Sequence, residues 1–223
     1  MLDQLVSEDY VQRLPKRRGY MLGERVLDLS AGFSNQDAVV EVARPFLSSF
    51  TQKFKWPLVL ATLDIDAMRI RASTGPESPF SAIGDRAYLL HRRIPLLPTA
   101  IGRAYLAFCP DDERQTVLSL LRSSSRVLDR PARNVRSLNE LLGSVAKAGY
   151  AGTDIVPGDP ATGLAVPIRF GERVLGTLAL RYLRNAISEK EVMRRYLCPL
   201  QTTASSIADA YAKKERRAST NGL

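Results

Sequence analysis

Two pairs of strand-like segments, separated by a long stretch of helical sequence, constrain the fold of this chain more than any other feature. The first pair covers residues 56–63 and 68–72, which flank a hairpin turn at residues 64–67. The second pair covers residues 164–168 and 174–180 and is also joined by a short turn. Strands joined by short turns pair antiparallel. The pattern therefore predicts an α+β fold with an antiparallel sheet flanked by helices.

The segments around these strands show the spacing of apolar residues that is typical of helices. From Gln36 to Phe54 the apolar residues fall on one face of a helix, and Pro45 is expected to kink that helix or to start a new segment. Residues 135–148 show a further helical pattern, which Gly149 is expected to end as a C-cap. Both helices are long enough to cover part of a sheet.

Capping residues mark three more helix starts. The threonine that opens residues 99–108 is a predicted N-cap, and residues 110–120 carry acidic side chains in their first turn. Ser188 and Glu191 form a capping box, which predicts a C-terminal helix with a break near Pro199. The chain therefore continues as helices between and after the strand pairs.

The N-terminal segment has the pattern of a helix end followed by a basic hairpin. Residues 2–6 have helical spacing, and residues 10–14 and 20–22 read as short strands. The turn between the strands carries Lys16, Arg17 and Arg18. Three cations at a hairpin tip favour contact with DNA phosphates, although a solvated turn would show the same residues.

A short amphipathic helix is expected directly after this hairpin. Leu22, Val26, Leu29 and Phe33 are spaced by four, three and four residues, so they share one helix face. Such a helix would be a connector between domains or part of a dimer seam, and both alternatives stay open.

Composition excludes several classes of site. The two cysteines, Cys109 and Cys198, lack the spacing of a disulfide framework or a zinc site, so both are expected to be small buried hydrophobes. The sequence has a single histidine, His91, so it cannot form a metal site with several histidines. Most catalytic arrangements that need an imidazole base are excluded for the same reason. No cofactor and no metal are predicted.

Net charge and hydropathy limit the kinds of partner that this chain is expected to bind. The net charge of +9 favours a polyanionic partner such as DNA. No apolar run approaches the ~18 residues that a membrane span needs, and the acidic N-terminus does not resemble a signal peptide. A cytoplasmic protein without a membrane partner is therefore expected.

Four short motifs, in order along the chain, resemble successive signatures of the IclR-type bacterial transcription regulators. They lie at residues 22–27, 95–104, 148–150 and 164–168. Each is weak alone, because it consists mostly of small and apolar residues, but together they cover nearly the whole chain. Within that family, Trp56-Pro57 with residues 62–68, and residues 106–110, resemble a subgroup that regulates aromatic catabolism.

The resemblance implies a domain layout. It consists of the end of a winged helix-turn-helix at residues 1–22, a linker helix at residues 23–35, a GAF-like effector-binding domain at residues 36–215 and a basic tail at residues 216–223. A homodimer or a dimer of dimers is implied as well. The sequence begins within what would be the recognition helix. We therefore expect the first helices of the DNA-binding domain to be missing, through truncation or a misplaced start codon, and specific operator binding by this segment to be weak.

The resemblance also implies an effector-binding site. Its expected residues are Arg86, Ile94, Thr99, Ala100, Ile101, Asp154, Ala165, Pro167, Leu178 and Leu180. Backbone N–H groups at a helix start favour an anionic ligand group near residues 99–101, and Leu178 and Leu180 share one strand face as an apolar wall. An ordinary capped helix on a leucine core would explain the same residues.

The expected function is that of an effector-responsive regulator that senses a small aromatic carboxylic acid and controls aromatic catabolism genes. The ring would lie against Leu178, Leu180 and Pro167, so that Leu178→Asp weakens binding by more than about tenfold. A sensor domain that acts only through protein partners is the alternative. An enzyme is disfavoured, because the sequence has no Gly-rich phosphate loop, G-x-S-x-G motif or metal-ligand cluster.

Overall fold

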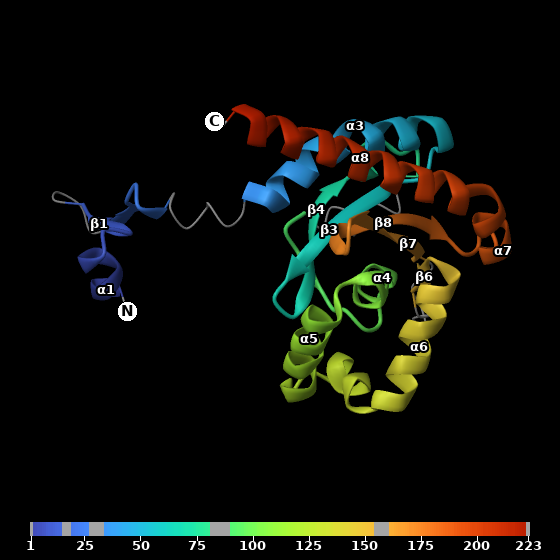
Figure 1. The fold of residues 1–223 in the computed structure, drawn as a ribbon, viewed down its shortest axis with the longest axis horizontal. Coiled ribbons are helices and arrows are strands. Elements are labelled where there is room, and N and C mark those ends of the chain that lie inside the picture. The colour runs from blue at the N-terminus through green and yellow to red at the C-terminus, as the bar shows by residue number, and fades with distance from the viewer. Residues whose placement is uncertain (1, 15–18, 27–33, 81–89, 154–160, 222–223) are drawn as a thin grey trace. The chain divides into compact units, whose positions relative to one another are not determined.

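A computed structural model of the chain describes residues 2–14, 19–26, 34–80, 90–153 and 161–221 (Figure 1). The chain divides into two compact units, Met1–Ala38 and Val39–Leu223, which we describe separately. Within the described ranges, no helix combines the length and the apolar character that crossing a membrane requires.

The first unit contains a short helix and a two-stranded hairpin. Helix α1 (Leu2–Ser7) precedes strands β1 (Val11–Arg13) and β2 (Tyr20–Leu22), which pair antiparallel with Gln12 opposite Met21. The guanidinium of Arg13 forms an ion pair with the Asp3 carboxylate and so ties the hairpin to α1. The predicted helix end and hairpin are confirmed. The basic tip, Lys16 to Arg18, and most of the expected linker helix lie outside the described residues.

The second unit is built on one six-stranded antiparallel sheet with the order β5-β4-β3-β8-β7-β6. Its strands are β3 (Leu58–Asp64), β4 (Ala67–Ser73), β5 (Arg93–Ile94), β6 (Ala151–Gly152), β7 (Ala161–Phe170) and β8 (Arg173–Leu183). Both predicted hairpins are present, as β3–β4 and β7–β8. They join at the centre of the sheet, where Leu58 pairs with Leu180 and Leu60 with Leu178.

Helices cover both faces of this sheet (Figure 1). Helices α3 (Ser34–Phe54) and α8 (Cys198–Asn221) lie on one face, and α4 (Ala100–Phe108), α5 (Asp111–Ser123) and α6 (Val135–Ala148) lie on the other. Apolar residues of the second group of helices form one buried cluster with the sheet. The strands are therefore buried on both sides, which explains why their sequences are almost continuously apolar.

Local capping chemistry sets the ends of the helices as predicted. The Thr99 hydroxyl accepts a hydrogen bond from the Gly102 nitrogen at 3.2 Å and caps α4. Ser188 accepts one from the Glu191 nitrogen at 3.3 Å and caps the short helix α7 (Glu189–Val192). Gly149 ends α6 with a φ of 79°, a left-handed conformation that glycine adopts without a steric penalty.

Pro45 and Pro199, the two prolines that were expected to disturb helices, behave differently. Helix α3 continues through Pro45, so this proline does not start a new segment. Ahead of Pro199, a π-helical turn, Met193–Leu197, joins α7 to α8. Proline has no N–H to donate to the preceding turn, and a wider turn accommodates that loss. The break that was expected near Pro199 is confirmed in this form.

Candidate ligand-binding site

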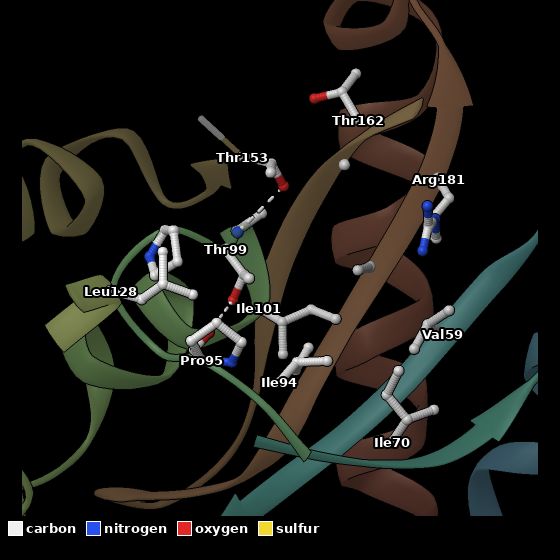
Figure 2. Close-up of a pocket in the computed structure, with 14 residues that line it drawn as sticks. Val59, Ile70, Ile94, Pro95, Thr99, Ile101, Leu128, Thr153, Thr162 and Arg181 are labelled. Carbon is white, nitrogen blue, oxygen red and sulfur yellow. Dashed lines mark hydrogen bonds between the residues drawn. The ribbon is translucent and has the colours of Figure 1, made fainter. Parts of the chain in front are cut away.

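A cavity of about 430 Å³ lies on the face of the sheet that α4 covers (Figure 2). Ile94 and Ile101 line it from the segment that leads into α4 and from α4 itself, and Val59, Ile70 and Ala179 line it from the sheet. This volume falls within the range of about 300–1,000 Å³ that is typical of small-molecule sites. The cavity is therefore large enough for a small organic ligand.

Small side chains on the sheet create this space. Ala179 pairs with Val59 on one side and with Ala165 on the other, so these three residues share a row across β3, β8 and β7. Gly163, one strand over from Arg181, also lines the cavity. Because glycine and alanine project almost no side chain from the sheet, the first turn of α4 does not fill the volume above them.

The start of α4 is tied to a distant strand. The Ala100 nitrogen donates a hydrogen bond to the Thr153 hydroxyl at 3.2 Å, and Thr153 directly follows β6. The Thr99 hydroxyl donates to the Pro95 carbonyl at 2.8 Å in addition to capping the Gly102 nitrogen. Two of the helix-start donors are therefore already used inside the protein.

Leu128 forms part of the rim of the cavity. It lies in the 3-10 segment Val127–Arg133 and is 54% exposed. Arg126 holds this segment, because its guanidinium contacts the Asp129 carboxylate at 2.6 Å and the Asp66 carboxylate at 2.6 Å. Asp66 belongs to the β3–β4 turn, so ion pairs connect the rim to the sheet.

The cavity has a polar end and an apolar end. Figure 2 shows Thr153, Thr162 and Arg181 together at one end, and Ile70, Ile94 and Ile101 toward the other. Arg181 is half-buried and is the one charged side chain among the described residues that line the cavity. The lining therefore suits a ligand that has one polar part and one apolar part.

The structure brings together four of the predicted site residues. Ile94, Thr99, Ala100 and Ile101 all line the cavity. Arg86 and Asp154 lie outside the described residues.

Four predicted strand residues do not line the cavity. Ala165 is fully buried within the sheet on the α4 side, and Pro167 lies half-buried two residues farther along β7. Leu178 and Leu180 require a correction, because they lie on the opposite face of the sheet. Each pairs with a leucine of β3 in a row that alternates with the Val59 and Ala179 row, and both are fully buried on the side that α3 and α8 cover.

Sequence reasoning missed the two residues of β8 that do face the cavity, Ala179 and Arg181. A period of two separates residues 178 and 180 from 179 and 181, but it does not say which set faces a ligand when both faces are buried. The arginine itself was the available signal. A charged side chain within an apolar strand needs a polar or open environment, so its face is the one with access to solvent or ligand.

A separate group of titratable residues lies in the core between α4 and α5. Burial and a hydrogen bond from its hydroxyl to the Glu113 carboxylate raise the pKa of Tyr105 well above its ordinary value. Burial also raises the pKa of the Cys109 thiol to about 12. Neither residue lines the cavity, and the described residues contain no cluster of three or more potential metal ligands.

The two cysteines, both of which were predicted to be buried, differ in their exposure to solvent. Cys109 is buried at the end of α4, as expected, whereas Cys198 is exposed at the first residue of α8. The expectation for Cys198 was wrong, because its position in the first turn of α8 faces away from the buried stripe that includes Leu200 and Ile207.

Comparison with known protein sequences gives only weak matches. No family model matches the chain. The HTH-type transcriptional regulator TsaQ1/TsaQ2 of Comamonas testosteroni is 28% identical over 118 residues, which are 53% of this chain and 42% of that protein. The match therefore spans less than half the length of this curated relative.

Solved structures of transcription regulators share the fold. An IclR homolog complexed with 4-hydroxybenzoate, from Microbacterium hydrocarbonoxydans, has a TM-score of 0.64 at 23% identity, over 95% of this chain and 83% of that one. The C-terminal domain of the E. coli transcriptional regulator KdgR has a TM-score of 0.61 at 22% identity, over 78% of this chain and 98% of that one.

These likenesses show the fold of the second unit. Its antiparallel sheet with flanking helices is that of the C-terminal domain of IclR-type regulators, which confirms the predicted fold class. The Comamonas protein and KdgR are both named as transcriptional regulators.

Proposed function

We propose that this chain is the effector-responsive part of an IclR-type transcription regulator and that the cavity beside α4 is its effector site. The observation that carries the proposal is an amphipathic cavity of about 430 Å³ in a domain with the fold of such regulators. The order of the sequence motifs at residues 22–27, 95–104, 148–150 and 164–168 supports the same family.

We further propose that the effector is a small aromatic carboxylic acid, and that the target genes serve aromatic catabolism. Isoleucines 70, 94 and 101 offer the ring an apolar surface, which stabilises a bound ring by about 25 cal/mol per Å² of buried area. The segments at residues 56–57, 62–68 and 106–110 resemble the activator of 3-(3-hydroxyphenyl)propionate catabolism. One structure with this fold was determined with 4-hydroxybenzoate bound.

The first unit supports DNA binding. Its β1–β2 hairpin is consistent with a wing, and the turn sequence carries Lys16, Arg17 and Arg18. Cations at a wing tip bind phosphates without reading the base sequence. We expect a homodimer or a dimer of dimers in the cytoplasm, because a two-fold operator is most easily bound by a two-fold protein.

Binding of the full-length gene product to the DNA around its own gene tests this proposal. We expect a sequence-specific shift at physiological salt that 3-(3-hydroxyphenyl)propionate strengthens or weakens. Replacing the three wing-tip cations by alanine should lower the slope of log affinity against log salt by up to about three. A full-length protein that binds the aromatic acid but no DNA would instead be a sensor that acts through protein partners.

A further inference from the structure

Asp66, in the turn between β3 and β4, contacts two segments that contribute to the lining of the cavity. Its Oδ1 atom accepts a hydrogen bond from the Arg93 guanidinium, and its Oδ2 atom accepts one from the Arg126 guanidinium at 2.6 Å. Arg93 directly precedes Ile94, and Arg126 lies two residues before Leu128. Both Ile94 and Leu128 line the cavity, as Figure 2 shows. One carboxylate therefore connects two parts of the cavity lining.

Each of these two arginines has a further carboxylate partner. The Arg93 guanidinium contacts the Asp64 carboxylate at 2.9 Å, and the Arg126 guanidinium contacts the Asp129 carboxylate at 2.6 Å. If Asp66 lost its charge, each guanidinium would keep one ion pair, and the buried Asp129 would keep its own. Such a change would loosen the connection between the two segments without leaving a buried charge unpaired.

The segment that holds Leu128 is incompletely stabilised by its own contacts. Leu128 and its neighbour Val127 are both exposed, although Leu128 lines the cavity. The Oδ1 atom of Asp129, one residue further, is buried and has no hydrogen-bond partner among the described residues. A buried oxygen without a partner costs free energy. The position of Leu128 therefore depends on contacts from outside the segment, of which the Asp66–Arg126 ion pair is one.

We propose that Asp66 is a positioning residue of the effector site. By connecting Arg93 to Arg126 it fixes the separation of Ile94 and Leu128, and thereby the affinity for the ring of the effector. This inference rests on the proposed function, since it assumes that the cavity is the effector site. Asp66 does not line the cavity, so it acts through these two apolar side chains. A bound ring buries the exposed surface of Leu128, provided that the ion pair holds Leu128 in place.

The contribution of Asp66 should depend on salt, because its side chain and those of both arginines are partly exposed. The exposed fractions are 26% for Asp66, 41% for Arg93 and 46% for Arg126. Ion pairs at such sites are screened by salt, since the Debye length falls from about 10 Å at 0.1 M to about 3 Å at 1 M. A role in apolar packing alone would not weaken as the salt concentration rises.

Calorimetric titration of the full chain with 3-(3-hydroxyphenyl)propionate tests the proposal. Asparagine has the shape of aspartate but one oxygen acceptor and no charge, so it cannot bind both arginines. We expect Asp66→Asn to weaken binding by about 3- to 10-fold at about 0.1 M potassium chloride, and by less than about twofold at about 1 M. Asp66→Glu keeps the charge and should recover most of the affinity. Asp209→Asn is the control, because it removes an exposed carboxylate of α8 on the other face of the sheet.

A double variant tests whether Asp66 acts through Leu128. Leu128→Ala alone should weaken binding, and Asp66→Asn should add less than about twofold in that background, because residues that act through one element have non-additive effects. Val127→Ala is the matched control, since Val127 is exposed beside Leu128 but does not line the cavity. Asp66→Asn should keep its full effect in the Val127→Ala background.

Melting curves verify that each variant is folded at the temperature of the titration. Unchanged binding by Asp66→Asn, or a loss of the same size at both salt concentrations, would overturn the positioning role of Asp66 while leaving the cavity as the effector site. Additive losses in the double variant with Leu128→Ala would overturn it as well. A wild-type chain that does not bind the acid would overturn the proposed aromatic-acid effector and this inference together.

Discussion

The hydroxyl oxygen of Thr153 lies 3.2 Å from the backbone nitrogen of Ala100. This hydrogen bond links the residue after β6 to the first turn of α4, and both segments line the cavity. The position of α4 over the sheet therefore depends on a side chain far away in the sequence. It also uses one of the donors that a helix start would otherwise offer to a ligand.

Thr153→Val tests the strength of this link. Valine has nearly the same shape as threonine but cannot accept the Ala100 N–H, and Ala100 is buried. We expect the free energy of unfolding to fall by about 1–3 kcal/mol, measured by urea denaturation. Thr116→Val removes an exposed hydroxyl from α5 and should change stability by less than about 0.5 kcal/mol. Equal effects of the two substitutions would contradict the assigned role of Thr153.

Gly102 should not tolerate even the smallest side chain. A Cβ atom there would lie 2.2 Å from the Leu96 carbonyl oxygen and 2.3 Å from its Cα atom. We expect Gly102→Ala to lower the melting temperature markedly, although alanine stabilises an open helix position by about 1 kcal/mol relative to glycine. Gly143→Ala in α6 is the control, since nothing lies within 4 Å of its added Cβ. It should leave stability unchanged or raise it, and a similar result for Gly102→Ala would contradict the close packing of α4.

Leu178 is expected to affect folding and not ligand contact. Its side chain is fully buried on the α3 and α8 face, so Leu178→Asp would place an unpaired charge in the core and prevent stable folding. The milder Leu178→Ala should cost about 2–5 kcal/mol of unfolding free energy. Its dissociation constant for the aromatic acid, measured below the melting transition, should stay within about twofold of wild type. A selective loss of binding in a stable variant would place Leu178 at the site.

The two cysteines should differ in reactivity toward iodoacetamide. The thiolate is the reactive form, and a pKa of about 12 leaves Cys109 almost entirely protonated at pH 8. We expect one alkylation in the native chain, at Cys198, and a second only after unfolding, as read by mass spectrometry. Modification of Cys109 in the native chain at the rate of Cys198 would contradict the buried environment at the end of α4.

The raised pKa of Cys109 also predicts how stability varies with pH. Because the folded state holds this proton more tightly than the unfolded state, the contribution is fully present below the unfolded pKa of about 8.5. It is lost as pH rises toward 12. The urea midpoint should therefore fall less steeply between pH 8 and pH 11 in Cys109→Ala than in wild type. The same pH dependence of the midpoint in both proteins would contradict a contribution from Cys109.

Local signals in the sequence were sufficient to predict much of the fold. Thr99, Gly149 and Ser188 cap their helices through contacts within a few residues, so their roles can be inferred from the sequence. The β3–β4 and β7–β8 hairpins follow from short turns between apolar segments in the same way.

The side of the sheet that carries the cavity could not be predicted from periodicity. Leu178 and Ala179 are neighbours in β8 that face different groups of helices, and which group leaves a cavity depends on how distant helices pack. The link from Thr153 to Ala100 is also long-range and leaves no local pattern. The size difference between Ala179 and its leucine neighbours indicates the open side only once the sheet order is known.

Calorimetric titration of the chain with 3-(3-hydroxyphenyl)propionate, compared between wild type and Ala179→Leu, tests the cavity assignment most directly. Leucine at position 179 would project into the cavity, whereas Leu178→Met changes the opposite face with little change of volume. We predict measurable binding by wild type and by Leu178→Met, and a loss of more than about tenfold in Ala179→Leu with its fold intact. Equal affinity in Ala179→Leu and wild type would contradict the assignment of the effector to this cavity.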